Sequence, residues 1–337
     1  MRRVLIGVTA AALWSVVAAD VRAGVVSDFF VVGDIYATIT KENGPNLVDR
    51  YSSDGAYIDM MPIRPIALGA SARGLAFGPD GLLYVVQSFP GPASKFEVQS
   101  YNSSGVLQDR YAYDGPGSYL DGNISFGKIG FDDSGHFYVG SGGGLVQFTQ
   151  GSTESGRLFF PTAGSGVFDV KALANGNLLV ALRNDVYEID GSGTILQDLK
   201  HVGGGGGLDF ADLRGIEYDA GAGVLYATML GYTGHSYQIM KIDFATGALL
   251  GTRSFNYADD LSLSADGRLV VGSRTQSPIT LDEDLNLLNS LSSSQDTRMF
   301  VTQFGPAAAV PEPASIALLG FGVAVATLGA AARRRPR

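Results

Sequence analysis

Six charged residues stand directly before short apolar segments that recur along the chain. They are Arg73, Lys128, Asp169, Arg214, Asp259 and Asp260. If the recurring segments are equivalent strands, the six side chains meet at one end of a shared central channel. The arginines would then offer forked donors to the carboxylates or hydroxyls of a polar ligand. The alternative is that the opposite charges pair with one another and plug the channel.

Other residue types form no recognisable catalytic arrangement. The histidines His136, His201 and His235 lack the close spacing of metal motifs, and we expect them beside surface loops. The acidic turns at 132–134 and 282–284 lack the alternating pattern of a calcium loop. The glycine run 203–207 is followed by Leu208-Asp209-Phe210 and not by a helix, so we expect a flexible link between two blades rather than a phosphate cradle. The sequence therefore predicts no catalytic residue, no metal site and no cofactor.

Composition narrows the classes of partner. Residues 24–310 contain 17 Lys and Arg against 31 Asp and Glu, which makes this part of the chain more acidic than the whole, at −9. Such a charge disfavours nucleic acid as a partner. The sequence contains no cysteine, so it has no disulfide, thiolate metal site, cysteine nucleophile or lipidated cysteine.

The apolar segments that follow the charged residues are parts of an internal repeat. Copies begin at residues 75, 129, 170, 216 and 261, and each consists of an apolar strand, a turn with glycine and a second apolar strand. A second hairpin follows each copy, which gives four strands per repeat. Starts separated by 41 to 54 residues are typical of propeller blades.

A sixth blade is assembled from both ends of the repeat region. Residues 47–58 supply an outer hairpin, residues 29–38 a strand before it, and residues 299–304 the missing inner strand. The predicted fold is therefore an all-β, six-bladed β-propeller closed by its two ends. A parallel β-helix or a two-sheet sandwich fits the period less well.

The repeats resemble the broad group of six-bladed propellers that includes NHL-repeat and gluconolactonase-like proteins. A gluconolactonase-like hydrolase would hold one divalent cation in the channel with carboxylates and amides. In this register the acids are Asp169, Asp259 and Asp260, and the arginines beside them would repel a cation. A secreted metal-dependent hydrolase or lyase is therefore the alternative to a non-enzymatic binding or scaffold protein.

The N-terminus has the pattern of a secretory signal. Met1-Arg2-Arg3 precedes an apolar run over residues 4–17, and small residues place cleavage at Ala19 or Ala23. The run is shorter than the ~20 residues of a membrane span. A buried N-terminal helix is the alternative. We expect signal peptidase to remove this segment during export.

The C-terminus has three parts in the order of a sorting signal. They are Pro311, Glu312 and Pro313, an apolar stretch over residues 316–332, and Arg333, Arg334 and Arg335. This tail resembles the PEP-CTERM signal of Gram-negative bacteria. The resemblance implies processing by an exosortase, export to the cell exterior and association with exopolysaccharide. A simple uncleaved membrane anchor is the alternative.

Together these features predict the domain order and the destination of the protein. We expect a protein that is anchored in the inner membrane before processing and then lies at the cell surface or outside the cell, where it binds exopolysaccharide or another surface protein. The expected segments are a signal peptide (1–23), the propeller (24–304), a linker with the Pro-Glu-Pro motif (305–315), a transmembrane sorting helix (316–332) and a cytoplasmic arginine-rich tail (333–337).

Overall fold

A computed structural model describes most of the predicted propeller. The described residues are 29–39, 46–67, 69–89, 95–115, 127–162, 166–199, 213–229, 237–273, 275–291 and 300–303. Across these ranges every element is a strand, and no helix long and apolar enough to cross a membrane occurs. The predicted signal peptide and sorting helix lie outside them.

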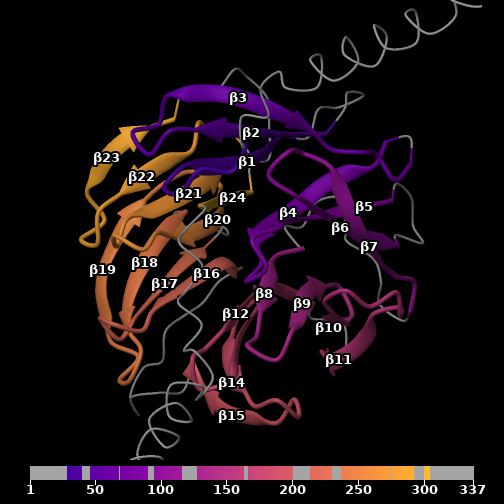
Figure 1. Cartoon of the computed structure of the whole chain (residues 1–337). Helices are drawn as coiled ribbons and strands as arrows, with labels where there is room; N and C mark the ends of the chain where they lie inside the picture. The colour runs from indigo at the N-terminus through magenta and orange to yellow at the C-terminus, as the bar shows by residue number, and fades with distance from the viewer. Residues whose placement is uncertain are drawn as a thin grey trace, which may run out of the picture.

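The described strands form six antiparallel sheets of four strands, which are the blades of a propeller (Figure 1). The first three blades, from the axis outward, are blade 1 with β24 (Val301–Gln303), β1 (Ile35–Ile39), β2 (Leu47–Tyr51) and β3 (Tyr57–Pro62); blade 2 with β4 (Ser71–Phe77), β5 (Leu83–Ser88), β6 (Phe96–Tyr101) and β7 (Leu107–Tyr113); and blade 3 with β8 (Ile129–Phe131), β9 (His136–Ser141), β10 (Gly144–Thr149) and β11 (Arg157–Pro161).

The other three blades have the same order of strands. They are blade 4 with β12 (Val167–Ala172), β13 (Leu178–Leu182), β14 (Val186–Ile189) and β15 (Ile195–Asp198); blade 5 with β16 (Leu213–Asp219), β17 (Val224–Met229), β18 (Gln238–Asp243) and β19 (Leu249–Ser254); and blade 6 with β20 (Ala258–Leu263), β21 (Leu269–Ser273), β22 (Ile279–Leu281) and β23 (Leu287–Ser290).

The ring closes through the C-terminal strand, as the sequence predicts. The innermost strands β4, β8, β12, β16, β20 and β24 contact one another in a closed circle. β24 pairs antiparallel with β1, with Ala37 opposite Val301. The strand predicted over residues 29–38 begins only at Ile35, because the amide of Asp34 donates to the carbonyl of Val31 and closes a turn.

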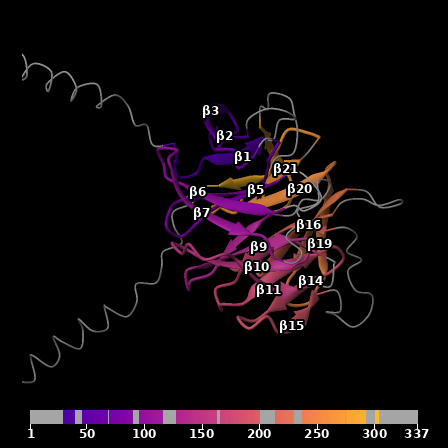
Figure 2. The same cartoon turned by 90° about the vertical axis from the view of Figure 1, so that its right-hand side faces the viewer.

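The meander order of each blade gives the propeller two different faces. One face, which we call the turn face, carries the tight hairpin turns at residues 52–56, 78–82, 102–106, 132–136, 173–177, 190–194, 243–248, 264–268 and 282–286. The opposite face, the loop face, carries the connections between the second and third strands and between blades. Figure 2 shows the blades edge-on between these two faces.

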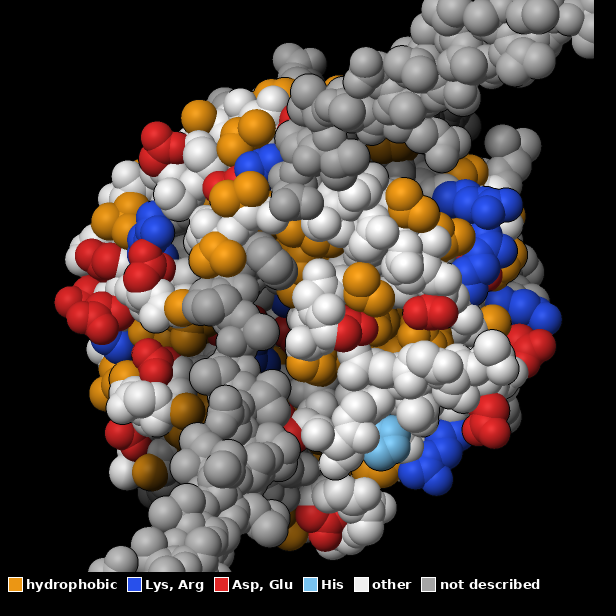
Figure 3. Space-filling model, viewed as in Figure 1, with side chains coloured by type: hydrophobic (Ala, Val, Ile, Leu, Met, Phe, Trp, Pro, Cys, Tyr) orange, Lys and Arg blue, Asp and Glu red, His pale blue; other side chains and the backbone are white. Residues whose placement is uncertain are grey.

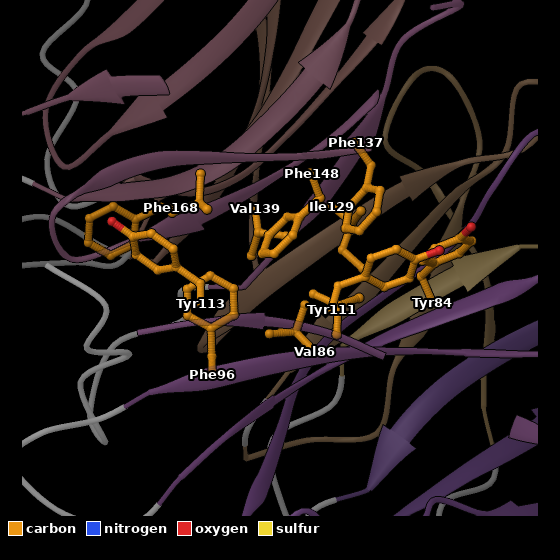
Figure 4. Packing of buried hydrophobic residues seen from close by; sticks show 12 residues of the cluster. Tyr84, Val86, Phe96, Tyr111, Tyr113, Ile129, Phe137, Val139, Phe148 and Phe168 are labelled. Carbon is orange, nitrogen blue, oxygen red and sulfur yellow. The ribbon is translucent and has the colours of Figure 1, made fainter. Parts of the chain in front are cut away.

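Apolar side chains between neighbouring blades form the core. In one cluster, residues of blade 2 meet residues of blade 3 (Figure 4). The ring of Tyr111 meets the ring of Phe137 edge to face at 4.9 Å, and Phe137 stacks on Phe148 at 4.9 Å. Such aromatic pairs contribute about 0.5 to 1.5 kcal/mol beyond their buried area. Each blade is therefore stable only with its neighbours in place.

The closing strand provides a test of this dependence. Deleting residues 298–304 removes the inner strand of blade 1, including buried Phe300 and Val301, and exposes the edge of β1. We expect unfolding or aggregation, because the lost burial of about 1.5 to 3 kcal/mol per large side chain approaches the whole margin of about 5 to 15 kcal/mol. Deleting residues 305–337 is the matched control and should leave one cooperative thermal transition. Equal melting temperatures of the two truncations would contradict closure by β24.

Candidate functional site

Five of the six charged residues lie on innermost strands and Lys128 lies directly before β8, and in the repeat they occupy two neighbouring positions. Register shifts in β4, β16 and β20 leave Arg73, Arg214 and Asp259 without an opposite residue, so each is the extra residue of a β-bulge. Lys128 and Asp260 occupy the next position of the repeat, Lys128 just before β8 and Asp260 within β20. Asp169 also follows a bulge, whose extra residue is Phe168. The predicted single ring is therefore two layers, one residue apart along the axis.

The deeper layer consists of Lys128, Asp169 and Asp260. Lys128 reaches across the axis and joins the two carboxylates. Its ammonium pairs with a carboxylate oxygen of Asp260 in blade 6 and lies 3.9 Å from Asp169 Oδ2 in blade 4. It also donates to the carbonyl of Leu261 at 2.7 Å. All three charged side chains are buried, and Asp260 is fully enclosed. Ionised groups are found at such depth when they are paired.

Both carboxylates also accept hydrogen bonds from backbone amides, in the same pattern. Asp169 accepts from its own neighbour Val170 and from Ile216 of blade 5, each at 2.7 Å. Asp260 accepts in the same way from Leu261 and from Val301 of blade 1, again at 2.7 Å. An innermost strand has no further strand to receive its amides, and buried amides need an acceptor. Each carboxylate thus ties its blade to the next one.

Burial changes the pKa of the Asp169 carboxyl. Loss of hydration raises the pKa of its carboxyl to about 6, although the charge of Lys128 and the amides of Ile216 and Val170 act in the opposite direction. The folded pKa exceeds the ordinary value of 3.8, so the folded state binds more protons between these values. The contribution of Asp169 to the free energy of unfolding therefore falls as the pH rises through about 6.

The layer nearer the loop face consists of Arg73, Arg214 and Asp259, and its contacts differ from those of the deeper layer. The guanidinium of Arg214 lies 4.8 Å from the ring centre of Phe168, a cation–π contact. Arg73 Nε donates to Ser88 Oγ at 3.1 Å within its own blade. Like the deeper residues, Arg73, Arg214 and Asp259 are buried. The arginines are thus held in place by the propeller itself, before any ligand arrives.

Sequence reasoning missed the residues that make room for this arrangement. In the repeat register, Gly74 and Gly215 occupy the position of Lys128, Asp169 and Asp260 in blades 2 and 5. A Cβ on Gly74 would lie 2.1 Å from the carbonyl oxygen of Gly127. The inner strands therefore approach too closely there for any side chain. In the sequence, glycine at this position in two of the aligned repeats was the signal that could have revealed the close approach.

The carboxylates of the deeper layer are poorly suited to bind a metal. The Lys128 ammonium occupies the position between Asp169 and Asp260 that a cation would take, and their oxygens already accept from amides. Among the described residues, no group of three or more His, Cys, Asp or Glu side chains could hold a metal ion. A cation at the axis would first have to displace the lysine.

The remaining candidates are dispersed. His136 lies at the start of β9 with its Nδ1 3.2 Å from Asp132 Oδ2, and the Asp282 carboxylate accepts amides of its own turn. Both fit the expected surface turns. His201, His235, the glycine run 203–207, and the sorting residues Pro311, Glu312, Pro313, Arg333, Arg334 and Arg335 lie outside the described residues.

Replacing the bridging lysine tests the axial cluster. The variant Lys128→Met leaves buried carboxylates without their cation, and we expect it to lower the free energy of unfolding by about 3 to 5 kcal/mol at neutral pH. Without the lysine the pKa of Asp169 rises above about 6, so the loss should be smaller at pH 5 than at pH 8. Urea unfolding at both pH values measures it.

The matched control is Lys95→Met, because Lys95 pairs with Asp114 where both side chains are more than half exposed. Its cost should stay within about 1 kcal/mol at either pH. An equal cost for the two lysine variants, or a loss at Lys128 that does not change with pH, would contradict the bridging role.

Comparison with solved structures supports the architecture. The chain is similar to a chain of the nidogen/laminin complex, with 13% identity and a TM-score of 0.58, covering 80% of this chain and 98% of the other. It is also similar to a protein of unknown function from Bacteroides caccae, with 12% identity, a TM-score of 0.54 and the same coverages. At these identities the likeness shows the fold alone. No curated protein matches the chain.

The C-terminal segment has a match of its own. Residues 309–335 match the family model of the PEP-CTERM protein-sorting motif. This match includes Pro311, Glu312, Pro313 and the arginines 333–335, and it confirms the resemblance seen in the sequence. Such a motif implies export, membrane-anchored sorting and processing by an exosortase. The chain is thus a six-bladed β-propeller that carries a PEP-CTERM sorting motif.

Proposed function

We propose that the protein is a non-enzymatic binding or scaffold component of the cell surface, associated with exopolysaccharide. The observation that carries this proposal is the sorting motif at residues 309–335, because it directs an exported body to the outside of the cell. The proposed sequence of events is removal of residues 1–23 by signal peptidase, anchoring through residues 316–332 with residues 333–337 in the cytoplasm, and release of the body by exosortase.

The axis of the propeller supports binding over hydrolysis. A metal-dependent hydrolase needs carboxylates that are available to a cation, and those of Asp169 and Asp260 are engaged by Lys128 and by backbone amides. An acidic body also favours solubility outside the cell. These features support a protein that binds a partner without catalysing a reaction.

The proposed ligand site is the axial layer nearer the loop face. Arg73 and Arg214 supply guanidinium groups, which match the geometry of carboxylates. Both side chains are buried, so a ligand reaches them with one projecting group rather than by lying flat. A single sugar carboxylate on an acidic polysaccharide has the required charge, and contact through this one group limits repulsion by the acidic body. Lys128, Asp169 and Asp260 lie below and support this layer.

Processing of the tail tests the sorting part of the proposal. Replacing Pro311-Glu312-Pro313 with three alanines leaves the apolar stretch and the arginines unchanged, so transfer across the membrane should still stop there. We expect normal export with loss of processing, visible as a larger product that stays in the membrane fraction. Shortening and release as in the native chain would show that the motif is not what directs processing.

Ligand binding tests the second part. With alginate as the acidic polysaccharide and dextran as the neutral one, the full chain should bind only alginate. Arg214→Gln should weaken binding about 10-fold or more, since one charge-assisted contact contributes at least about 1.5 kcal/mol. Arg110→Gln, at an exposed position on β7, is the control and should have no effect. Equal affinity of the native chain and Arg214→Gln, or no binding of alginate, would contradict this site.

A further inference from the structure

Both ends of the described body lie on the turn face. β24 runs toward that face, because Gln303 is opposite Ile35, the first residue of β1. The Gln303 side chain donates to the carbonyl of Gly33 at 2.6 Å, which fixes the end of β24 to the segment before β1. Gln303 therefore lies at the turn face, and the sorting motif begins six residues later, at residue 309.

Two exposed valines lie in the segment before β1. Val31 and Val32 are 40% and 59% exposed and stand in the turn closed by the amide of Asp34. The amide of Phe29 donates to the carbonyl of Ser103 in the neighbouring turn, where Val106 is 55% exposed. Three exposed apolar side chains thus stand on the turn face, and two of them directly precede Gly33, which is hydrogen-bonded to Gln303.

Packing around the valines holds their segment firmly, and Asp34 and Asp59 share one guanidinium there, that of Arg50. The rings of Phe29 and Phe30 are buried and pack edge to face against Tyr36, whose hydroxyl donates to the carbonyl of Phe29. The nearby carboxylate of Asp34 is paired with Arg50 at 2.6 Å. The buried phenylalanines anchor this segment and leave its valines outside.

We propose that the turn face is held against the lipid bilayer while the protein is anchored, with Val31, Val32 and Val106 in contact with the lipid interface. The proposal rests on the membrane-anchored sorting step that the motif implies. At most about 45 Å of extended chain separates Gln303 from Ile316, the start of the predicted span. Such a short tether gives a high effective concentration of the bilayer near this face, so a weak apolar contact is populated.

The opposite side of the turn face, over blades 4 to 6, has more acidic turn residues than the side of blades 1 and 2, where Asp54 and Asp80 lie in the turns. Figure 3 shows this face, with acidic side chains gathered on its left. The turns of blades 4 to 6 present Asp190, Asp243 and Asp282, and hydrogen bonds within these turns lower the pKa of each carboxyl. They stay ionised and are repelled by anionic headgroups. Gln303, from which the tether continues, lies on the side of blade 1, so this side lies closest to the membrane, and the loop face with its proposed ligand site points away from it.

The absence of cysteine allows a direct test with single labels. The full chain is reconstituted into vesicles of phosphatidylcholine and anionic phosphatidylglycerol that contain a spin-labelled lipid with its nitroxide near the headgroups. A fluorophore is placed at Val32→Cys, at Ser192→Cys in the β14–β15 turn, or at Asn184→Cys in the β13–β14 connection of the loop face. We expect strong quenching at position 32, weaker quenching at 192 and almost none at 184.

Flotation of the same vesicles reports anchoring separately from orientation. If the chain floats with the vesicles but position 184 is quenched as strongly as position 32, the orientation is wrong while the sorting proposal survives. If the chain does not float, the anchor itself is refuted, and both proposals fail. A further pair of proteins carries the label at position 106, one with Val31 and Val32 and one with Val31→Ser/Val32→Ser. Both should float, and the double variant should show at least 2-fold less quenching. Unchanged quenching would refute the valine contact.

Discussion

The propeller depends on how the amides of its innermost strands are satisfied at the axis. Asp169 and Asp260 accept amides from their own strands and from the next blades, and Lys128 joins them across the channel. These contacts connect blades 3 to 6 with blade 1. The amide of Val301, in the closing strand, is among those bound by Asp260. Closure of the ring and charge pairing at its centre are therefore parts of one arrangement.

Sequence alone predicted much of this because the repeat has a strong local signal. Strand, glycine turn and strand recur with apolar patterning, and that determined the blade count and the closing role of residues 299–304. The axial charges were identified, but their two layers were not, since a bulge changes the register by one residue without altering the apolar pattern. Pairing of Lys128 with Asp260 joins residues that are far apart in sequence, which no local rule can reveal.

The same residues limit what the axis can do. Lys128 lies between Asp169 and Asp260, and each carboxylate oxygen of these aspartates accepts a hydrogen bond. These contacts hold the ring together and leave the carboxylates unavailable for a reaction. The proposed ligand site therefore lies elsewhere, at the loop face and the arginines next to it. Gln303, after which the tail follows, lies at the opposite face. One face therefore suits anchoring and the other suits a partner in the surroundings of the cell.

The most direct test of the axial arrangement is a crystal structure of the propeller grown near pH 7 in the presence of calcium. The account predicts that the Lys128 ammonium lies within hydrogen-bonding distance of Asp260 and beside Asp169, with no ion between them. A calcium ion bound by Asp169 and Asp260, with Lys128 turned away, would contradict it and would favour a metal-dependent enzyme on the same scaffold.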